Sequence, residues 1–96
     1  MSYVIVARWR AREGEGEKVE AIVRELVPAC RQEPGVLQFV SHRSLDNPNE
    51  FLLYEEYKGE QDFLDHQQTS HFKTLVVGSA IPLLEHRERL PFNILI

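Results

Sequence analysis

Hydrophobic and polar residues alternate along four segments of the chain, and each alternation predicts a β-strand. The strands are expected at residues 1–12, 36–44, 50–57 and 83–90. In the first of them both faces begin with apolar residues, with Tyr3 and Ile5 on one side and Val4 and Val6 on the other. We therefore expect other parts of the protein to cover both sides of this strand.

Residues 17–30 follow a helical period instead of the strand period. Apolar side chains recur there every three or four positions, which is typical of an amphipathic helix of three or four turns. Pro28 is expected to kink the last turn, and Pro34-Gly35 is expected to end the helix.

A second helix is expected from about Glu60. Its pattern predicts a break around Thr69-Ser70, followed by a further helical turn through residues 72–76. Ser70 is a suitable N-cap for this second helical segment.

The resulting order of elements, β-α-β-β-α-β, predicts an α+β fold of the ferredoxin-like kind in a single domain over residues 1–96. Both helices would lie on one face of a four-stranded antiparallel sheet. The other face would expose an apolar patch in a monomer, formed by Val4, Val6, Leu52 and Tyr54. We therefore predict a homodimer in which two sheets pack face to face, with the apolar tail at residues 91–96 as an arm across the interface.

Composition and charge exclude several functions. The chain is 43% hydrophobic and 27% charged. Its net charge of −4 does not favour binding to nucleic acid or to an anionic membrane, both of which attract positively charged proteins. Arginines gather near both ends of the chain, and their spacing of two predicts one wet or partner-facing side of a strand; they are Arg8, Arg10 and Arg12 in one group and Arg87 and Arg89 in the other.

Cys30 is the only cysteine, so no disulfide can form within the chain, and its place in the apolar stripe of the first helix predicts a buried, inert thiol. The sequence contains no signal peptide pattern and no apolar run that approaches the length of a membrane span. We therefore expect the protein to reside in the cytoplasm.

The candidate chemistry lies in residues 54–73, YEEYKGEQDFLDHQQTSHFK. Alternation along the 50–57 strand points Glu55 into the layer between sheet and helices, where a carboxylate requires a hydrogen-bonding partner. His66 and His71 are the predicted partners, since a break at Thr69-Ser70 lets both imidazoles turn towards Glu55. Such a pair could move protons near neutral pH, or it could be only a satisfied buried pair. No zinc-binding spacing accompanies these residues, so no metal is predicted. No Gly-rich dinucleotide motif is present either, so no cofactor is predicted.

Aromatic residues could form the flat walls of a pocket beside this pair. Trp9 and Tyr57 are expected on the helix-facing side of the sheet. They fit either a hydrophobic core or a pocket for a planar ligand, and the sequence does not separate the two roles.

These features together resemble a known family. The opening strand, the EPGVLQF segment, the FLLYEEY strand and the HQQTSHF segment, in this order and at these distances, resemble the antibiotic biosynthesis monooxygenase domain over nearly the whole chain. The most specific part is the Tyr-Glu-x-aromatic strand followed by the paired histidines, here Tyr54, Glu55, Tyr57, His66, His71 and Phe72.

The resemblance implies a dimeric α+β barrel and a cofactor-independent monooxygenase that oxidises a hydroquinone or polyphenol. Its partners would be a small planar aromatic substrate and dioxygen. The catalytic residues would be Glu55, His66 and His71, and the substrate-binding residues would be Trp9, Tyr57, Phe63 and Phe72. This chain departs from the family in having Tyr57 where tryptophan is frequent, and its first strand lacks the asparagine of haem-degrading relatives, so haem chemistry is not expected.

Two alternatives use the same residues differently. The first is an acid–base isomerase of a small phosphorylated keto-sugar, which requires cations at the pocket from Arg8, Arg10 or Arg43. The second is a dimeric ligand-binding module without catalytic activity, in which the same residues serve stability.

Overall fold

The computed structural model describes residues 2–96, so Met1, which the alternation places in the first strand, lies outside the described residues. The elements follow the predicted β-α-β-β-α-β order. They are β1 (Tyr3–Ala11), α1 (Gly16–Arg31), β2 (Val36–Arg43), β3 (Glu50–Tyr57), α2 (Glu60–His66), the π-helix η1 (Phe72–Ala80), the 3₁₀ turn η2 (Ile81–Leu83) and β4 (Leu84–Phe92).

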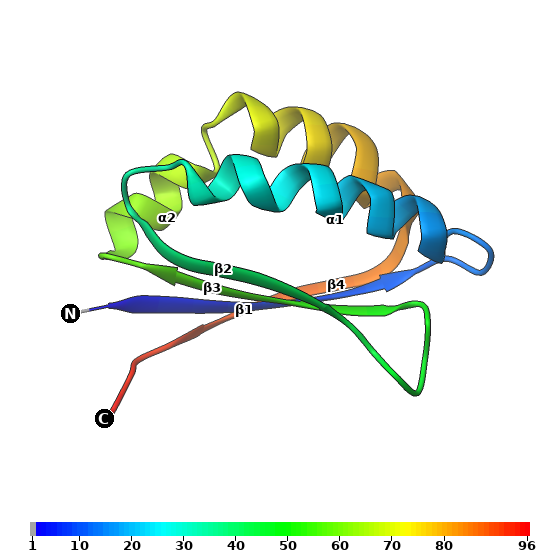
Figure 1. Ribbon diagram of the computed structural model, residues 1–96, viewed down its shortest axis with the longest axis horizontal. Helices are drawn as coiled ribbons and strands as arrows, with labels where there is room; N and C mark the ends of the chain where they lie inside the picture. Colours follow the sequence, from blue (N-terminus) through cyan, green and yellow to red (C-terminus); the bar gives the residue numbers. More distant parts are fainter. Residues whose placement is uncertain (1) are drawn as a thin grey trace.

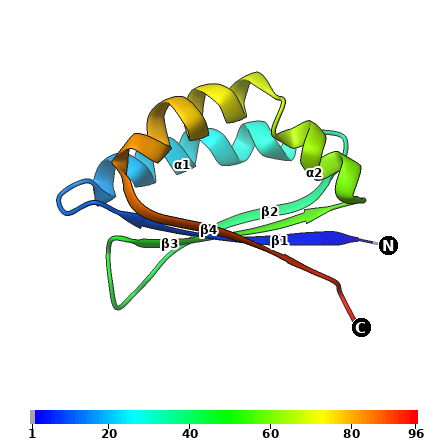
Figure 2. The same cartoon turned by 180° about the vertical axis from the view of Figure 1, so that it is seen from behind.

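The four strands form one antiparallel sheet in the order β2-β3-β1-β4. The helices α1, α2 and η1 all lie on one face of this sheet (Figures 1 and 2). The ferredoxin-like α+β fold predicted from the sequence is therefore confirmed. Within residues 2–96, no helix is long and apolar enough to cross a membrane.

The core forms between the helices and the inner face of the sheet. On β3, residues at alternate positions are buried on this inner face, whereas the residues between them are only partly covered. The inner face of β3 presents Phe51, Leu53, Glu55 and Tyr57. Glu55 is thus the one charged residue in this row, and it points towards the helices as the alternation predicts.

The chain breaks between α2 and η1, as expected. Thr69, however, provides the cap instead of Ser70: its hydroxyl oxygen accepts a hydrogen bond from the N–H of Phe72 at 3.2 Å and donates one to the carbonyl oxygen of His66 at 2.8 Å. Ser70 is exposed. The predicted cap at Ser70 is therefore wrong by one residue, because only the Thr69 hydroxyl reaches backbone groups on both sides of the break.

Replacing Thr69 with alanine should lower the free energy of unfolding by about 1 kcal/mol, the usual effect of losing a side-chain cap. Ser70→Ala is the matched control and should change it by less than about 0.5 kcal/mol, since Ser70 is an exposed surface residue. Urea unfolding of the three proteins measures both values. Equal losses in the two variants would contradict the assignment of the cap to Thr69.

A register shift in β4 changes which side chains face the helices. The pairing of β1 with β4 is irregular between Arg10 and Ala11, where Arg10 pairs with His86 but Ala11 pairs with Leu84. β4 therefore has one more residue than β1 at this point. Every later residue of β4 then faces the opposite side of the sheet from the side that simple alternation would give it. Arg87 consequently pairs with Trp9, an inward-facing residue of β1.

The same shift corrects the sequence prediction for the second arginine group. Arg87 and Arg89 were expected on a wet or partner-facing side. Both line the space beneath the helices, where Arg87 is partly buried and Arg89 remains exposed to solvent as expected. Leu90 instead pairs with Val6 on the outer face, where 41% of its surface is exposed. A short-range pattern could not reveal this bulge, since it depends on how β1 and β4 pair.

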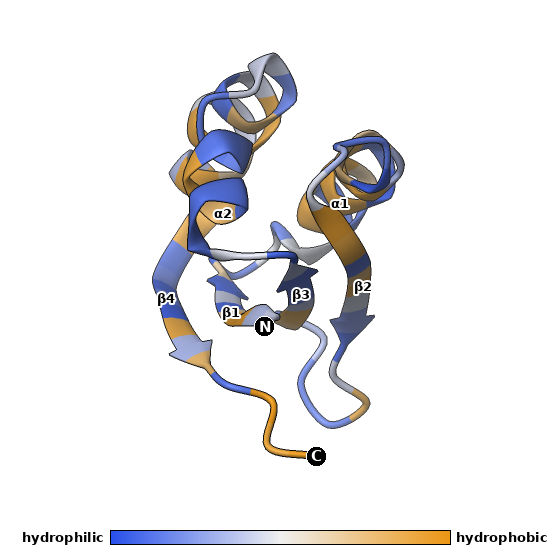
Figure 3. Cartoon of the chain, turned by 90° about the vertical axis from the view of Figure 1, so that its left-hand side faces the viewer, coloured by the Kyte–Doolittle hydropathy of each residue, from blue (hydrophilic) through white to orange (hydrophobic). Residues whose placement is uncertain are grey.

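The outer face of the sheet differs in part from the prediction. Val4 is only 3% exposed in the single chain, whereas Val6, Leu52 and Tyr54 are partly exposed. Val4 pairs with Phe92, which belongs to β4 and not to the free tail. The apolar chain end leaves the sheet on the side opposite the helices (Figures 1 and 3).

Candidate functional site

A narrow cavity of about 20 Å³ lies between the inner face of the sheet and the helices. Apolar and aromatic side chains form most of its wall, and four ionisable residues complete it. The residues that line it are Ala7, Trp9, Leu26, Phe39, Leu53, Glu55, Phe63, His66, Phe72, Val76, Arg87 and Arg89. A buried, mostly apolar pocket with a few converging polar groups is the usual form of a small-molecule site.

Glu55 is 5% exposed and is hydrogen-bonded to Tyr57, which lies two positions along the same face of β3. The Tyr57 hydroxyl donates to Glu55 Oε1 at 2.6 Å. The expected hydrogen bond between Glu55 and an imidazole is therefore wrong. The physical reason is that the phenol on the same strand already satisfies the carboxylate, while another acid binds the histidines.

Burial raises the pKa of Glu55 to about 7, although the hydrogen bond from Tyr57 and the nearby His66 and Arg89 act in the opposite direction. Burial, together with the Glu55 charge, also raises the pKa of the Tyr57 phenol. The phenol therefore stays protonated and remains a donor at neutral pH. A carboxylate with a pKa near 7 can accept or release a proton at that pH, as a general base must.

Arg87 lines the cavity and has an unused hydrogen-bond donor. Among residues 2–96, its Nε atom is buried without a hydrogen-bond partner. Burial and the neighbouring Arg89 lower the pKa of Arg87, while Glu55 opposes this change. Buried donors are almost always satisfied, so an orphaned guanidinium nitrogen at a cavity indicates a place for an oxygen atom of a ligand or water.

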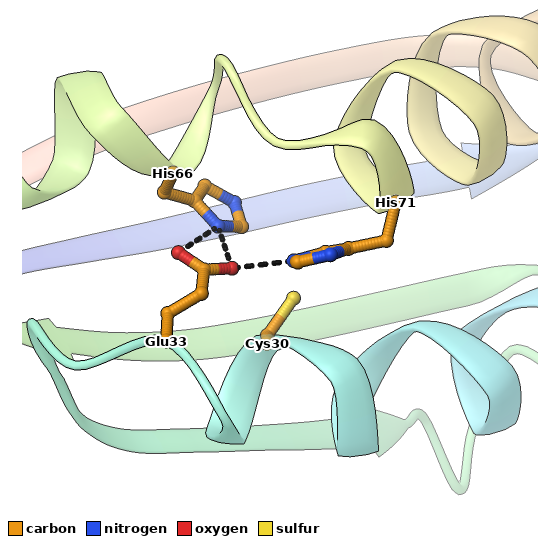
Figure 4. A group of neighbouring side chains, drawn as sticks. All are labelled: Cys30, Glu33, His66 and His71. Carbon is orange, nitrogen blue, oxygen red and sulfur yellow. Dashed lines mark hydrogen bonds and ion pairs between the residues drawn. The ribbon is translucent and has the colours of Figure 1, made fainter.

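The two histidines meet a different acid. His66 Nδ1 lies 2.9 Å from Glu33 Oε2, and His71 Nε2 lies 2.6 Å from the same oxygen atom. The Cys30 thiol adjoins them, as Figure 4 shows. We call these four residues, Cys30, Glu33, His66 and His71, the histidine cluster.

Glu33 is the shared acceptor of this cluster. Burial acts to raise its pKa, but the hydrogen bonds from His66 and His71 outweigh burial and hold the pKa below its usual value. Burial, with the nearby Glu33, raises the pKa of the Cys30 thiol. Glu33 therefore remains ionised beside a protonated thiol, and the burial expected at Cys30 is confirmed.

The structure brings together most of the predicted site residues, but in two groups. Glu55, His66, Trp9, Phe63 and Phe72 line the cavity. Tyr57 does not line the cavity but contacts residues that do, through its hydrogen bond to Glu55 and its packing against Phe63 and His66. His71 bonds to Glu33 instead of lining the cavity.

Sequence reasoning missed Glu33, Arg87 and Arg89. Glu33 directly precedes Pro34-Gly35, and the segment predicts only the end of a helix. Its contacts with His66 and His71 span 33 and 38 positions of the chain. Nothing in the local pattern identifies such a partner.

The arginines that an isomerase of a phosphorylated sugar was expected to use lie elsewhere. Arg10 binds Glu50, and Arg43 binds Glu17 and Glu20. Arg8 and Arg43 line a separate open hollow of about 260 Å³ that none of the buried acids reaches. Within the described part of the chain, Arg87 and Arg89 are the arginines that line the interlayer cavity.

Comparisons with known proteins agree with the fold. The antibiotic biosynthesis monooxygenase family model matches residues 2–77. No curated protein matches the sequence. A Nitrosomonas europaea protein named after the same family is 25% identical with a TM-score of 0.93, and the match covers 98% of this chain and 90% of that one. The protein PA3566 from Pseudomonas aeruginosa is also 25% identical with a TM-score of 0.93, over 99% and 95% of the two chains.

A third solved structure shows the fold alone. It is a Bacteroides thetaiotaomicron protein described as a possible oxidoreductase, 23% identical with a TM-score of 0.84 over 95% of this chain and 97% of that one.

Proposed function

Because this chain belongs to the antibiotic biosynthesis monooxygenase family, we propose that it is a cofactor-independent monooxygenase. Its substrate is a hydroquinone or polyphenol, and dioxygen is the oxidant. The reaction takes place in the interlayer cavity, and the protein supplies a base, a cation and an apolar enclosure.

One observation carries this proposal: Glu55, a buried carboxylate with a pKa of about 7, and Arg87, whose Nε atom has no hydrogen-bond partner, line the same aromatic-walled cavity. A phenol needs both groups, since a base removes its proton and a cation stabilises the oxyanion that remains. The apolar wall strengthens both interactions by excluding water.

Glu55 is the proton acceptor in this proposal. Both imidazoles, which the sequence indicated as bases, are engaged with Glu33, and His71 does not line the cavity. His66 keeps a role as a polar wall residue beside the substrate. Trp9, Phe63 and Phe72 provide aromatic faces for a planar ring.

The reaction balances without a cofactor. Glu55 takes the phenolic proton, and the electron-rich phenolate transfers an electron to dioxygen. The resulting superoxide and semiquinone combine at a ring carbon to form a C–O bond. Cleavage of the O–O bond then releases one oxygen atom as water and leaves the other on the ring. A hydroquinone and one dioxygen thus give one hydroxyquinone and one water, with all four electrons drawn from the substrate.

A planar substrate needs more room than the cavity offers at rest, which is about one water molecule. The short helix α2, with only seven residues, carries Phe63 over this cavity and ends at the break before η1. We propose that α2 moves outward to admit the substrate, since short elements beside a break are those that open most easily.

Oxygen uptake tests the function. The protein, treated with EDTA and free of flavin, is mixed with a menadiol-like hydroquinone, and uptake is compared with that of the same mixture without protein. Enzyme-dependent uptake is the expected result. No uptake above this background across a panel of quinols would favour a non-catalytic binding module. Conversion of a phosphorylated keto-sugar under strict anaerobiosis would favour the isomerase.

We also propose that the protein is a homodimer in which the outer faces of two sheets pack together. The partly exposed Val6 and Tyr54 and the exposed Leu90 and Phe92 form one apolar area on this face. Members of this family are often dimeric. A patch of this kind on a small protein commonly marks an interface.

Leu90→Asp should therefore convert the dimer into a monomer. Two-fold symmetry would bury two unpaired charges, each costing several kcal/mol, so the dissociation constant should rise by more than about 100-fold. Leu64→Asp is the matched control, because Leu64 is 44% exposed on α2 and Leu90 is 41% exposed. Sedimentation velocity at micromolar concentration measures the change. A wild-type species near the 11.2 kDa chain mass would contradict the proposed dimer.

A further inference from the structure

We propose that Cys30, Glu33, His66 and His71 form a zinc site, with one Zn²⁺ bound by the four side chains of the histidine cluster. The sequence predicts no metal, because the four residues do not follow a familiar zinc-binding spacing. Folding brings them together from two parts of the chain.

The distances within the cluster suit a small ion. The sulfur, the carboxylate oxygen and one nitrogen of each imidazole all lie within 4.8 Å of one another. Four ligands around a tetrahedral zinc ion, at bond lengths of about 2.0–2.3 Å, stand about 3.3–3.8 Å apart. The two Glu33–histidine contacts, now 2.6 and 2.9 Å, would lengthen by about 0.4–0.9 Å to admit the ion at those bond lengths.

The donor atoms select the metal. One sulfur, two imidazole nitrogens and one carboxylate oxygen are the ligand types that zinc takes in proteins. Calcium and magnesium require sets made of oxygen atoms, which the cluster does not offer. A thiolate and two imidazoles also occur in copper sites, where the fourth ligand is weak and distant, whereas a carboxylate as the fourth ligand fits Zn²⁺.

The backbone places these ligands in two pairs. Cys30 lies in the last turn of α1 and Glu33 lies just beyond the end of that helix, and both side chains point towards the two histidines. His66 ends α2, and His71 precedes η1 across the break that Thr69 caps. A bound ion would tie the end of α1 to this break.

The surroundings of His66 hold its ring in place. The ring packs against Phe39 at 5.7 Å and against Phe72 at 5.1 Å between centroids. Packing of this kind around a ligand fixes its orientation, as outer-shell contacts do in known metal sites. The side chain of His71 is 21% exposed, which gives an ion a route in from solvent.

The charges balance when zinc binds. The Cys30 thiol loses its proton to solvent as the Zn–S bond forms, and neutral imidazoles coordinate through the two nitrogens that now face Glu33. The ion's two positive charges then meet one thiolate and one carboxylate. The bonds to the metal ion replace the hydrogen bonds that the Glu33 oxygen and the two imidazole nitrogens make when no metal is bound.

The site is closed, so its role differs from that of the proposed oxygenation. Four protein ligands fill the four positions of a structural zinc ion and leave none for a substrate. The zinc site is independent of the proposed monooxygenase reaction, and it is tested by metal binding without any measurement of enzyme activity.

Metal titration tests the site directly. EDTA-treated protein is dialysed and titrated with Zn²⁺ by calorimetry, and separately with Co²⁺ followed by absorbance. We expect one ion per chain, a thiolate-to-cobalt charge-transfer band and the intense visible bands of tetrahedral cobalt. Cys30→Ser should remove the charge-transfer band. Cys30→Ser and His71→Ala should each weaken binding by more than about 100-fold, beyond the 10–100-fold effect of losing an outer-shell partner.

His86→Ala is the control, because His86 is an exposed histidine on β4 outside the cluster. It should bind both ions as the wild type does. His71→Ala keeps the test sound if Cys30→Ser does not fold, since His71 is partly exposed whereas Cys30 is fully buried. Absence of binding, binding without the charge-transfer band, or binding that survives His71→Ala would overturn the proposal.

Discussion

Replacing Glu55 with glutamine is expected to lower the turnover of a hydroquinone by about 10²–10⁴-fold, the usual contribution of a general base. The amide keeps the shape of the side chain, and its oxygen can still accept the 2.6 Å hydrogen bond from Tyr57. It cannot accept a proton from the substrate. The rate of enzyme-dependent oxygen uptake measures the loss.

Glu56→Gln is the matched control for this experiment. Glu56 neighbours Glu55 on β3 but lies on the opposite face of the sheet, where it accepts a hydrogen bond from Gln38 at 3.3 Å. Its replacement should leave turnover within about two-fold, as expected for a group outside the cavity. Turnover that survives Glu55→Gln would show that another group removes the proton, and His66 would then be the first to replace.

The second large effect is on stability as a function of pH. Burial raises the pKa of Glu55 from its ordinary value of 4.5 to about 7. The folded chain therefore holds this proton more tightly than the unfolded chain does. The stabilisation is complete below about pH 4.5 and is lost as the pH rises through about 7. The loss by pH 8 should be on the order of 3 kcal/mol.

Charged and titratable groups from several elements surround Glu55, and most of them limit the rise of its pKa. Tyr57 on β3, His66 at the end of α2 and Arg89 on β4 favour the ionised carboxylate, and Glu33 after α1 opposes it. Arg87 is a further cation that lines the same cavity. These groups are present in both wild type and Glu55→Gln, so the comparison of the two proteins isolates Glu55.

Urea unfolding at pH 5 and pH 8, with EDTA present, measures the effect. The stability of Glu55→Gln relative to wild type should rise by on the order of 3 kcal/mol between the two pH values. Glu56→Gln should show no such change. A constant difference between wild type and Glu55→Gln at both pH values would contradict the raised pKa of Glu55.

Much of the fold could be predicted because each element has a local period. The alternation in EFLLYEEY correctly places Glu55 and Tyr57 on the helix-facing side of β3. The break before η1 was also visible in the sequence, because the apolar spacing changes at Thr69-Ser70.

The partners within the site could not be predicted in the same way. Glu33 contacts His66 and His71 only because the end of α1 lies beside the break after α2 in the folded chain. Arg87 faces the cavity because of one irregular residue in the pairing of β1 with β4. Both features depend on tertiary contacts. Several other acids and arginines have local sequences that are equally suitable, so the local pattern does not single out Glu33 or Arg87.

Labelling with ¹⁸O₂ follows both oxygen atoms of the proposed reaction. The chain is incubated with a menadiol-like hydroquinone under ¹⁸O₂ in unlabelled water with EDTA present, and the products are analysed by mass spectrometry. We expect a hydroxyquinone that carries one ¹⁸O atom, with the second ¹⁸O in water, and less than about one per cent of this product from Glu55→Gln. An unlabelled quinone formed together with labelled hydrogen peroxide, or labelled product that Glu55→Gln forms equally well, would contradict it.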